Sequence, residues 1–367
     1  LALVLDQLPY GSPNRLVYCA VDSQLFCPLT LNLQDSGVLV RGNATHRIIY
    51  EKPFGSDSVT AQIINQCIEG ILEPSQIYRI DHYLAKEFVS NIVIMRCSNA
   101  LFSSVWDNQH IACVRVIMHE KICLEGRGKF YDHYGALKDV VQNHLLQLFT
   151  LVALECPGRL SQVSLTREKS AILQAVQVKQ CIVGQYEGYR QEPGVNPNSL
   201  TETFAFVELA LDTPRWYGVP FYIETGKCLA SKRVEIQVIF KGVRPCAFQS
   251  GISCSGNILT IRLGPREGFS LILNSKVPNK VWQAMPVIMD FCHDCLYDLD
   301  TPQAYERVLC EVISGERSIA VSAEEIEAQW KIIEKAIQQK SILYSYSKGS
   351  AGPQEVQELL LCEGYEP

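Results

Sequence analysis

Residues 47–70 read RIIYEKPFGSDSVTAQIINQCIEG, and this stretch decides the class of the fold. Its apolar run Arg47–Tyr50 is typical of a short buried strand. Ser56 is a residue type that begins helices and Gly70 one that ends them, so a helix is predicted between the two. A second apolar run, Arg15–Val21, precedes the stretch. Strands that alternate with helices predict βαβ units and a parallel sheet.

The rest of the chain has a different pattern. Helices are predicted at 85–98, 138–155, 302–314 and 322–339, the second from apolar residues that recur at spacings of three and four. Strand candidates follow one another closely at 111–120, 203–211, 220–225, 234–240, 258–263 and 269–273. Such spacing predicts a mostly antiparallel sheet. The predicted fold is therefore an α/β lobe over residues 1–77, followed by a larger α+β domain over residues 78–367.

Composition excludes several classes of protein. The chain has 367 residues, of which 47% are hydrophobic and 20% charged, as in an ordinary globular protein. Its net charge of −6 argues against a nucleic-acid partner and against an electrostatic membrane anchor. No apolar run approaches the roughly 20 residues that a membrane helix needs, and the first residues lack the order of a secretory signal. We expect a cytoplasmic protein.

The 15 cysteines are scattered singly, with no small-domain disulfide framework. Reduced thiols in a cytosolic protein are therefore expected. Cys292 and Cys295 lie close together, but a structural zinc site needs four ligands and no second pair accompanies them. We predict no metal site, and interpret this pair as half-buried free thiols.

Two clusters of polar residues follow the predicted strands. Lys52 lies in EKPFG directly after the strand that ends at Tyr50, where α/β proteins place their ligands; the alternative is an exposed lysine at a strand end. The second cluster is RIDHYLAKE, residues 79–87. His82 and Lys86 are four apart at a predicted helix start and are therefore expected on one helical face, which suits the cluster to hold a phosphate; the alternative is a capped helix with solvated side chains.

The third cluster is Asp139–His144, within the long amphipathic helix. Asp139 and His144 are five residues apart and are not expected on one helical stripe. An imidazole is the natural proton acceptor at neutral pH, although a histidine inside a helix is more often a core residue.

Together these clusters resemble the motifs of the glucose-6-phosphate dehydrogenase family. RIDHYLAKE is similar to its active-site signature, with Ala85 where glycine is usual. Further stretches resemble other motifs of the family in the same order, from about Asn14 to the C-terminus: EKPFG 51–55, EGRG 125–128, DVVQNHLLQ 139–147, RWYGVPF 215–221, TGK 225–227 and AYER 304–307.

The resemblance implies a Rossmann-like dinucleotide-binding lobe, oxidation of glucose 6-phosphate at C1 to a lactone, NADP as the hydride acceptor, no metal, and a homodimer. It assigns His144 as the general base, steadied by Asp81. His82, Tyr83 and Lys86 would hold the 6-phosphate, and Lys52 would lie between sugar and cofactor. Glu125 and Asp139 would accept hydrogen bonds from sugar hydroxyls, and Lys227 and Lys232 would close the sugar site.

The chain also departs from the family pattern. No G-x-G-x-x-G precedes Glu51, so the resemblance predicts that this nucleotide-binding turn lies upstream of Leu1. Asp22-Ser23 replaces a Pro-Pro pair, Glu224 stands where arginine is usual, and Gly264 where glutamine is usual. Two alternatives stay open: a non-catalytic sugar-phosphate-binding or assembly protein, and a hexose-6-phosphate dehydrogenase of a secretory compartment. The choice between NADP and NAD also stays open.

Overall fold

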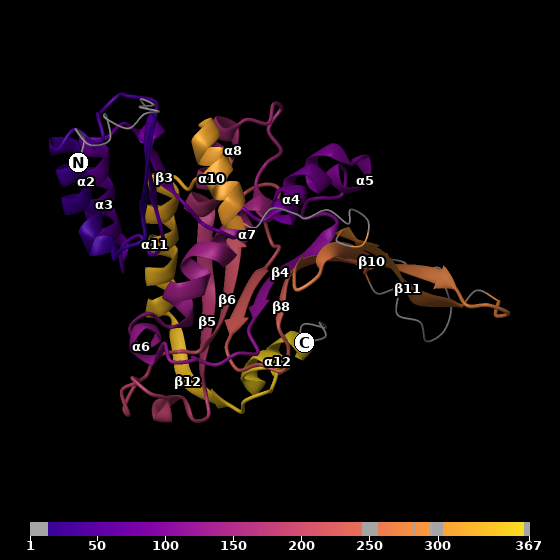
Figure 1. Ribbon diagram of the computed structural model, residues 1–367. Coiled ribbons are helices and arrows are strands. Elements are labelled where there is room, and N and C mark those ends of the chain that lie inside the picture. The colour runs from indigo at the N-terminus through magenta and orange to yellow at the C-terminus, as the bar shows by residue number, and fades with distance from the viewer. Residues whose placement is uncertain (1–13, 244–255, 282, 294, 296–303, 363–367) are drawn as a thin grey trace. The chain divides into compact units, whose positions relative to one another are not determined.

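The computed structural model describes residues 14–243, 256–281, 283–293, 295 and 304–362. The chain forms two compact units (Figure 1). Unit 1 comprises Leu1–Glu87, Pro157–Gln174 and Thr301–Glu334, and unit 2 comprises Phe88–Cys156, Ala175–Asp300 and Lys335–Pro367. The domain limits given by the sequence, 1–77 and 78–367, stay a prediction, because units defined by compactness interleave distant segments of the chain.

Unit 1 contains a three-stranded parallel sheet in the order β1-β2-β3, formed by Arg15–Cys19, His46–Tyr50 and Ile77–Arg79. Two helices connect these strands, α2 (Phe26–Asp35) and α3 (Ser58–Ile71). The predicted βαβ pattern is confirmed. Helix α3 starts two residues later than expected, because the Asp57 carboxylate, not Ser56, accepts the Thr60 amide at 2.7 Å.

Three more helices belong mainly to unit 1: α8 (Gln162–Ala175), α10 (Ala304–Ser314) and α11 (Ala323–Gln338). Helix α11 supports the segment that follows β2, since the Trp330 indole donates to the Phe54 carbonyl at 2.9 Å. The backbone amide of Ser58 also donates to Glu334 at 2.7 Å. The segment that follows Lys52 is therefore anchored to α11 at two points.

Unit 2 is built on a nine-stranded sheet in the order β11-β10-β9-β8-β4-β7-β6-β5-β12. Within this sheet, as far as its strands are described, only the pairs β4–β7 and β5–β12 are parallel, so the prediction of a mostly antiparallel sheet is confirmed. The strands are β4 Ile111–His119, β5 Val176–Tyr186, β6 Phe204–Leu211, β7 Phe221–Gly226, β8 Arg233–Phe240, β9 Ile258–Gly264, β10 Glu267–Lys276, β11 Ala284–Cys292 and β12 Lys340–Tyr346.

The helices that belong to unit 2, at least in the main, are α4 Glu87–Ser98, α5 Ala100–Ser103, α6 Gly128–Ala136, α7 Leu146–Ala153 and α12 Gln354–Cys362, with a π-helix, η3, at Leu137–Leu145. The η3–α7 segment packs on the central strands β4 and β7. Phe149 of α7 meets Phe221 edge-on, with ring centroids 5.0 Å apart. Among the helices of the described residues, none has the length and apolar character needed to cross a membrane.

The expectation of reduced thiols is wrong at eight of the described cysteines. Disulfides join Cys27 to Cys67, Cys97 to Cys156, Cys123 to Cys228 and Cys292 to Cys295. The first three pairs lie 40 to 105 residues apart in the sequence. Folding brings their Cα atoms within 4.7 to 5.9 Å, the range that a disulfide requires. Sequence spacing alone does not contain that information.

Candidate active site

In unit 1 the candidate residues follow two neighbouring strands. Strands β2 and β3 are parallel, with Tyr50 opposite Arg79, so their carboxyl ends lie at the same edge of the sheet. Lys52 follows the first strand, and Asp81 and His82 follow the second. This edge is where open α/β sheets bind ligands. The predicted position of Lys52 at a strand end is confirmed.

The segment from Asp81 to Lys86 forms turns and not the expected helix. The buried Asp81 carboxylate accepts the amide of Tyr83 at 2.9 Å, and the Leu84 amide donates to the Asp81 carbonyl at 3.0 Å. A side-chain acceptor of this kind competes with helical hydrogen bonding. Helix α4 therefore begins only at Glu87, and the prediction that His82 and Lys86 share one helical face is wrong.

The turns still gather cationic and aromatic groups. The Lys86 ammonium lies 5.3 Å from the centre of the Tyr83 ring, and the His82 ring is 5.1 Å from it. Tyr305 stacks on His82 at 6.0 Å, with an angle of 12° between the ring planes. Burial first, and then the neighbouring Glu51, raise the pKa of Tyr305. Tyr305 was assigned no role from the sequence, although the residue lies in the AYER motif, which resembles one of the family's motifs.

In unit 2 the candidate residues Asp139 and His144 lie on the π-helix η3. A π-helix pairs residue i with residue i+5, so two residues five apart come closer to one face than they do in an α-helix. The expectation that they occupy different stripes, which assumed α-helical winding, is therefore wrong. His144 is buried, and its backbone amide donates to the Asn143 side chain at 2.6 Å. Single-turn π segments often occur at functional sites.

Lys227 lies in the turn that directly follows β7, and its side chain is buried. Its ammonium forms an ion pair with Glu120 and lies 5.0 Å from the centre of the Tyr131 ring. Burial, and then the charge of Asp139, hold the pKa of Tyr131 well above its usual range. Tyr131 therefore lies near both the Lys227 ammonium and the Asp139 carboxylate. Glu120 and Tyr131 were not singled out from the sequence, which carries no motif signal for them.

Glu125 lies in an exposed loop between β4 and α6, with a backbone φ of +46°. The loop returns to the body of unit 2 at Gly128, where an added Cβ would lie 2.1 Å from the Pro193 carbonyl oxygen. The EGRG motif therefore needs glycine at its last position for close backbone approach. Lys232 is exposed directly before β8, and no described contact joins it to Lys227.

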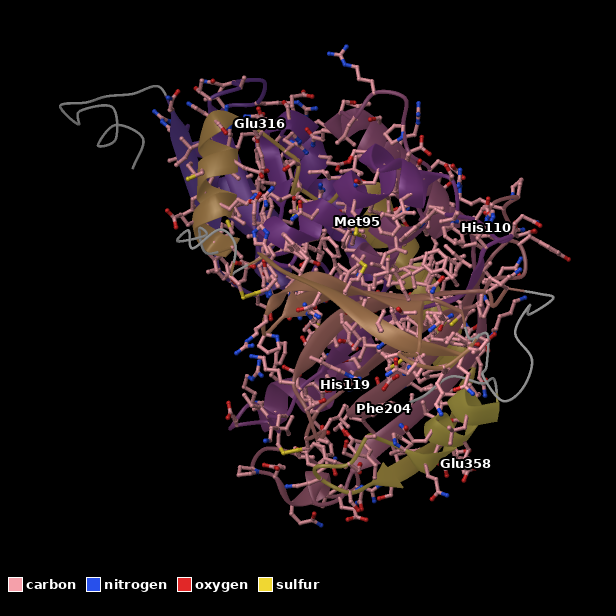
Figure 2. The ribbon with its side chains drawn as sticks, turned by 90° about the vertical axis from the view of Figure 1, so that its right-hand side faces the viewer. Met95, His110, His119, Phe204, Glu316 and Glu358 are labelled. Carbon is pink, nitrogen blue, oxygen red and sulfur yellow. A yellow bond between two sulfur atoms is a disulfide. The ribbon has the colours of Figure 1, made fainter. Side chains whose placement is uncertain are left out.

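Glu224, where the family pattern has arginine, is fully buried on β7. The ring of His119, which is labelled in Figure 2, donates to its carboxylate at 2.6 Å, and Arg115 lies 3.3 Å away. Burial alone would raise the pKa of Glu224, but the hydrogen bond from His119 and the charges of His119, Arg115 and Arg233 lower it to about 2. The carboxylate is thus ionised inside the sheet, and the neighbouring basic side chains compensate its negative charge.

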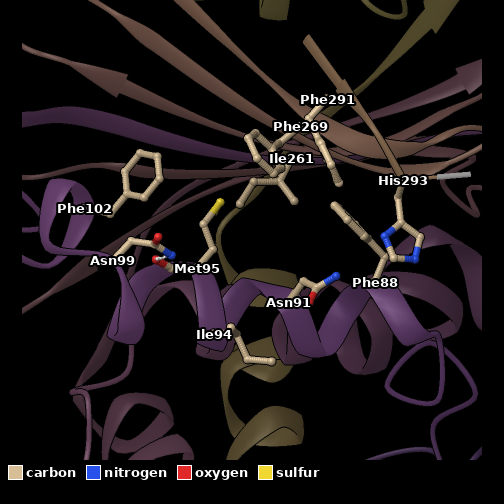
Figure 3. Close-up of a pocket in the computed structure, with 10 residues that line it drawn as sticks. All are labelled: Phe88, Asn91, Ile94, Met95, Asn99, Phe102, Ile261, Phe269, Phe291 and His293. Atoms are coloured by element: carbon tan, nitrogen blue, oxygen red, sulfur yellow. Dashed lines mark hydrogen bonds between the residues drawn. The ribbon is translucent and has the colours of Figure 1, made fainter. Parts of the chain in front are cut away.

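Unit 2 also holds an apolar cavity of about 290 Å³ between α4–α5 and strands β9–β11 (Figure 3). Met95 and Asn91 extend from α4 toward the strands, which present Ile261 and Phe269. None of the residues predicted to bind sugar or cofactor lines this cavity. This cavity is therefore not the predicted substrate site.

The described residues fit a nicotinamide dinucleotide to a limited extent. The carboxyl edge of β1–β3 has the strand arrangement at which such cofactors bind. Lys52 lies there, half-buried, next to Glu51, which accepts a hydrogen bond from Tyr18 of β1. A short parallel sheet of this kind, followed by a large mixed sheet, is typical of dinucleotide-dependent oxidoreductases with a separate substrate domain.

Comparison with known proteins narrows this class. A family model described as the NAD binding domain of glucose-6-phosphate dehydrogenase matches residues 3–91, and one described as its C-terminal domain matches residues 93–366. Glucose-6-phosphate 1-dehydrogenase of Chlamydia muridarum is 39% identical over 97% of this chain and 75% of its own length. The cytoplasmic isoform 5 of Arabidopsis thaliana is 36% identical over 97% of this chain and 70% of its own length.

Solved structures agree with these relatives. The Mycobacterium avium glucose-6-phosphate 1-dehydrogenase superposes with a TM-score of 0.85 at 32% identity, covering 96% of this chain and 76% of its own. A glucose-6-phosphate dehydrogenase in complex with glucose 6-phosphate gives 0.90 at 28% identity, covering 100% and 78%. The chain belongs to the glucose-6-phosphate dehydrogenase family.

Proposed function

We propose that this protein oxidises glucose 6-phosphate at C1 to 6-phosphogluconolactone with NADP, the first step of the pentose phosphate pathway. The observation that carries the proposal is the placement of RIDHYLAKE at the carboxyl end of β3, beside the strand that presents Lys52. The relative that was solved with glucose 6-phosphate supports this choice of substrate.

His144 is the general base of the proposed reaction. Its imidazole takes the proton of the C1 hydroxyl, and by the family pattern the Asp81 carboxylate fixes its tautomer and stabilises the imidazolium. His144 is buried on η3, so water is largely excluded from the group that receives the proton. The nicotinamide group, when bound, accepts the hydride.

The other residues bind and orient the sugar phosphate. His82, Tyr83 and Lys86 hold the 6-phosphate, and the aromatic contacts of His82 with Tyr83 and Tyr305 fix the direction of its ring. Because the phosphate is distant from C1, its binding energy can orient the reacting carbon. The sugar hydroxyls are bound by Glu125, Asp139, Lys227 and Lys232, and Lys52 contacts both the sugar and the dinucleotide.

The test of this proposal is to incubate the protein with glucose 6-phosphate and NADP and to follow NADPH absorbance. His144→Asn should lower kcat by a factor on the order of 10² to 10⁴, while the dissociation constant for glucose 6-phosphate changes little. His110→Asn is the matched control, because His110 is an exposed histidine of the same unit that pairs with Asp107.

Three results would decide against parts of the proposal. No NADPH at high protein concentration, with retained glucose 6-phosphate binding, would favour a sugar-phosphate-binding protein without turnover. Equal loss of binding and turnover in His144→Asn would remove the base assignment. A higher kcat/KM with NAD than with NADP would show that NAD, and not NADP, is the cofactor.

We also infer a cytoplasmic location, which the cytoplasmic Arabidopsis thaliana relative supports.

A further inference from the structure

Two sugar-site segments of unit 2 are joined by a covalent bond and by three backbone hydrogen bonds. The loop after β4 carries Glu125, and the turn after β7 carries Lys227. A disulfide joins Cys123 of the loop to Cys228 of the turn, with the Cα atoms 4.7 Å apart. The hydrogen bonds run from the amides of Glu120, Cys228 and Leu229 to the carbonyls of Gly226, Ile122 and Glu120, at 2.9, 3.1 and 3.0 Å.

The backbone on both sides of this disulfide is held in an unfavourable conformation. Glu125 has a φ of +46° and Cys228 a φ of +55°. Only one other non-glycine residue of the described chain, Asn279, has a positive φ. Such conformations persist only where the surrounding structure enforces them, and they concentrate at functional sites. The disulfide and its flanking hydrogen bonds supply that constraint here.

The disulfide and the three backbone hydrogen bonds form a junction between the loop and the turn. This junction also positions the Lys227 ammonium. Glu120, whose amide and carbonyl both take part in the junction, forms an ion pair with Lys227 through its side chain. The ammonium lies over the ring of Tyr131 of α6, 5.0 Å from the centre of the ring. The Tyr346 hydroxyl donates to the Lys227 carbonyl at 2.8 Å. A shift of the loop would therefore move Glu120 and Glu125 relative to Lys227.

We infer that the Cys123–Cys228 disulfide is a redox-sensitive positioning link of the sugar-phosphate site, and that its reduction weakens binding of glucose 6-phosphate. The inference rests on the proposed function, because it takes Glu125 and Lys227 as sugar ligands. A preorganised site binds more tightly since less ordering is left to occur on binding. Opening the bond removes one constraint from two strained residues that flank the ligand.

The reductant is a dithiol. Cys228 is buried, whereas Cys123 is partly exposed, so a dithiol thiolate attacks the sulfur of Cys123. The bond between the two cysteines breaks, Cys228 leaves as a thiolate and takes up a proton, and a mixed disulfide forms at Cys123. The second thiol of the reagent then releases Cys123 as a thiol, and the reagent becomes a cyclic disulfide. Two electrons and two protons pass to the protein.

The experiment measures glucose 6-phosphate binding by titration calorimetry before and after treatment of the full chain with dithiothreitol. Peptide mapping without reductant should first find Cys123 joined to Cys228. The dissociation constant should rise roughly three- to tenfold on reduction and return on reoxidation. Cys123→Ser should bind as weakly as the reduced protein and respond to dithiothreitol no further. Because reduction of the unaltered chain is reversible, that arm tests the inference even where the variant does not fold.

Cys27→Ser is the matched control, since it opens the disulfide between α2 and α3 of unit 1. It should keep the full response to dithiothreitol. Equal affinity in the oxidised and reduced protein, or a peptide map without the Cys123–Cys228 link, would overturn the inference while leaving the proposed function intact. No binding of glucose 6-phosphate in either redox state would instead refute the proposed substrate, and the inference with it.

Discussion

At the scale of single residues, Glu120 is expected to control how Lys227 meets the sugar. Its carboxylate is the anionic partner of a buried ammonium and is itself partly exposed. Glu120→Gln keeps the shape of the side chain but removes the charge, so Lys227 should lose its preferred position. We predict a KM for glucose 6-phosphate raised about fivefold, which corresponds to about 1 kcal/mol for a partly exposed ion pair.

Steady-state kinetics would check this value, with Glu187→Gln as the control. Glu187 is an exposed glutamate of the same unit, and its carboxylate accepts a hydrogen bond from Ser347. Its replacement should leave KM unchanged. A Glu120→Gln variant with an unaltered KM would show that the ion pair does not position Lys227 for binding.

The buried Glu224 predicts a pH dependence of stability. Its folded-state pKa of about 2 lies below the ordinary value of 4.5. A depressed carboxyl pKa stabilises the fold above the unfolded-state value, and that contribution is lost as pH falls through the folded-state value. The free energy of unfolding should therefore decrease between about pH 4.5 and 2 by on the order of 3 kcal/mol from this group. Urea unfolding across this range would measure it, and Glu224→Gln should remove that part of the slope.

At the scale of elements, a buried ion pair fixes helix α8 against α11 in unit 1. Lys169 and Glu325 are 2.7 Å apart, with both side chains almost fully buried. Lys169→Met should cost about 3–5 kcal/mol, because the Glu325 carboxylate then keeps its burial without its partner charge. Adding Glu325→Leu should recover most of this loss. Urea unfolding of the single and double variants would measure the coupling, and additive losses would contradict the prediction.

The local elements were largely predictable, whereas their long-range pairings were not. The apolar run before Lys52 was enough to locate β2, because a buried strand and the proline after it leave clear signals. Strand β3 has three residues, too few to show a period. The Asp81 turn and the π winding of η3 depend on hydrogen bonds that residue type does not specify. Pairs such as Cys123 and Cys228 depend on strand order, which only the fold defines.

At the scale of the whole molecule, the nine-stranded sheet ends at an edge strand with an apolar surface. Strand β11 pairs only with β10 among the described strands, and it exposes Met285, Ile288 and Met289. The two strands extend beyond the rest of the sheet (Figure 1). Exposed apolar edge strands tend to pair or aggregate unless they are covered. We propose that β11 is part of the surface between subunits in the homodimer that the family resemblance implies.

The prediction is that the protein behaves as a dimer in light scattering coupled to size-exclusion chromatography. Ile288→Lys should shift it toward the monomer, since a charge at an apolar interface is costly to desolvate. Ile342→Lys is the matched control, because Ile342 is an equally exposed isoleucine on β12, at the opposite edge of the sheet. It should leave the dimer unchanged. A shift to monomer with Ile342→Lys alone would place the interface at the β12 edge, and a monomeric unaltered protein would refute the homodimer.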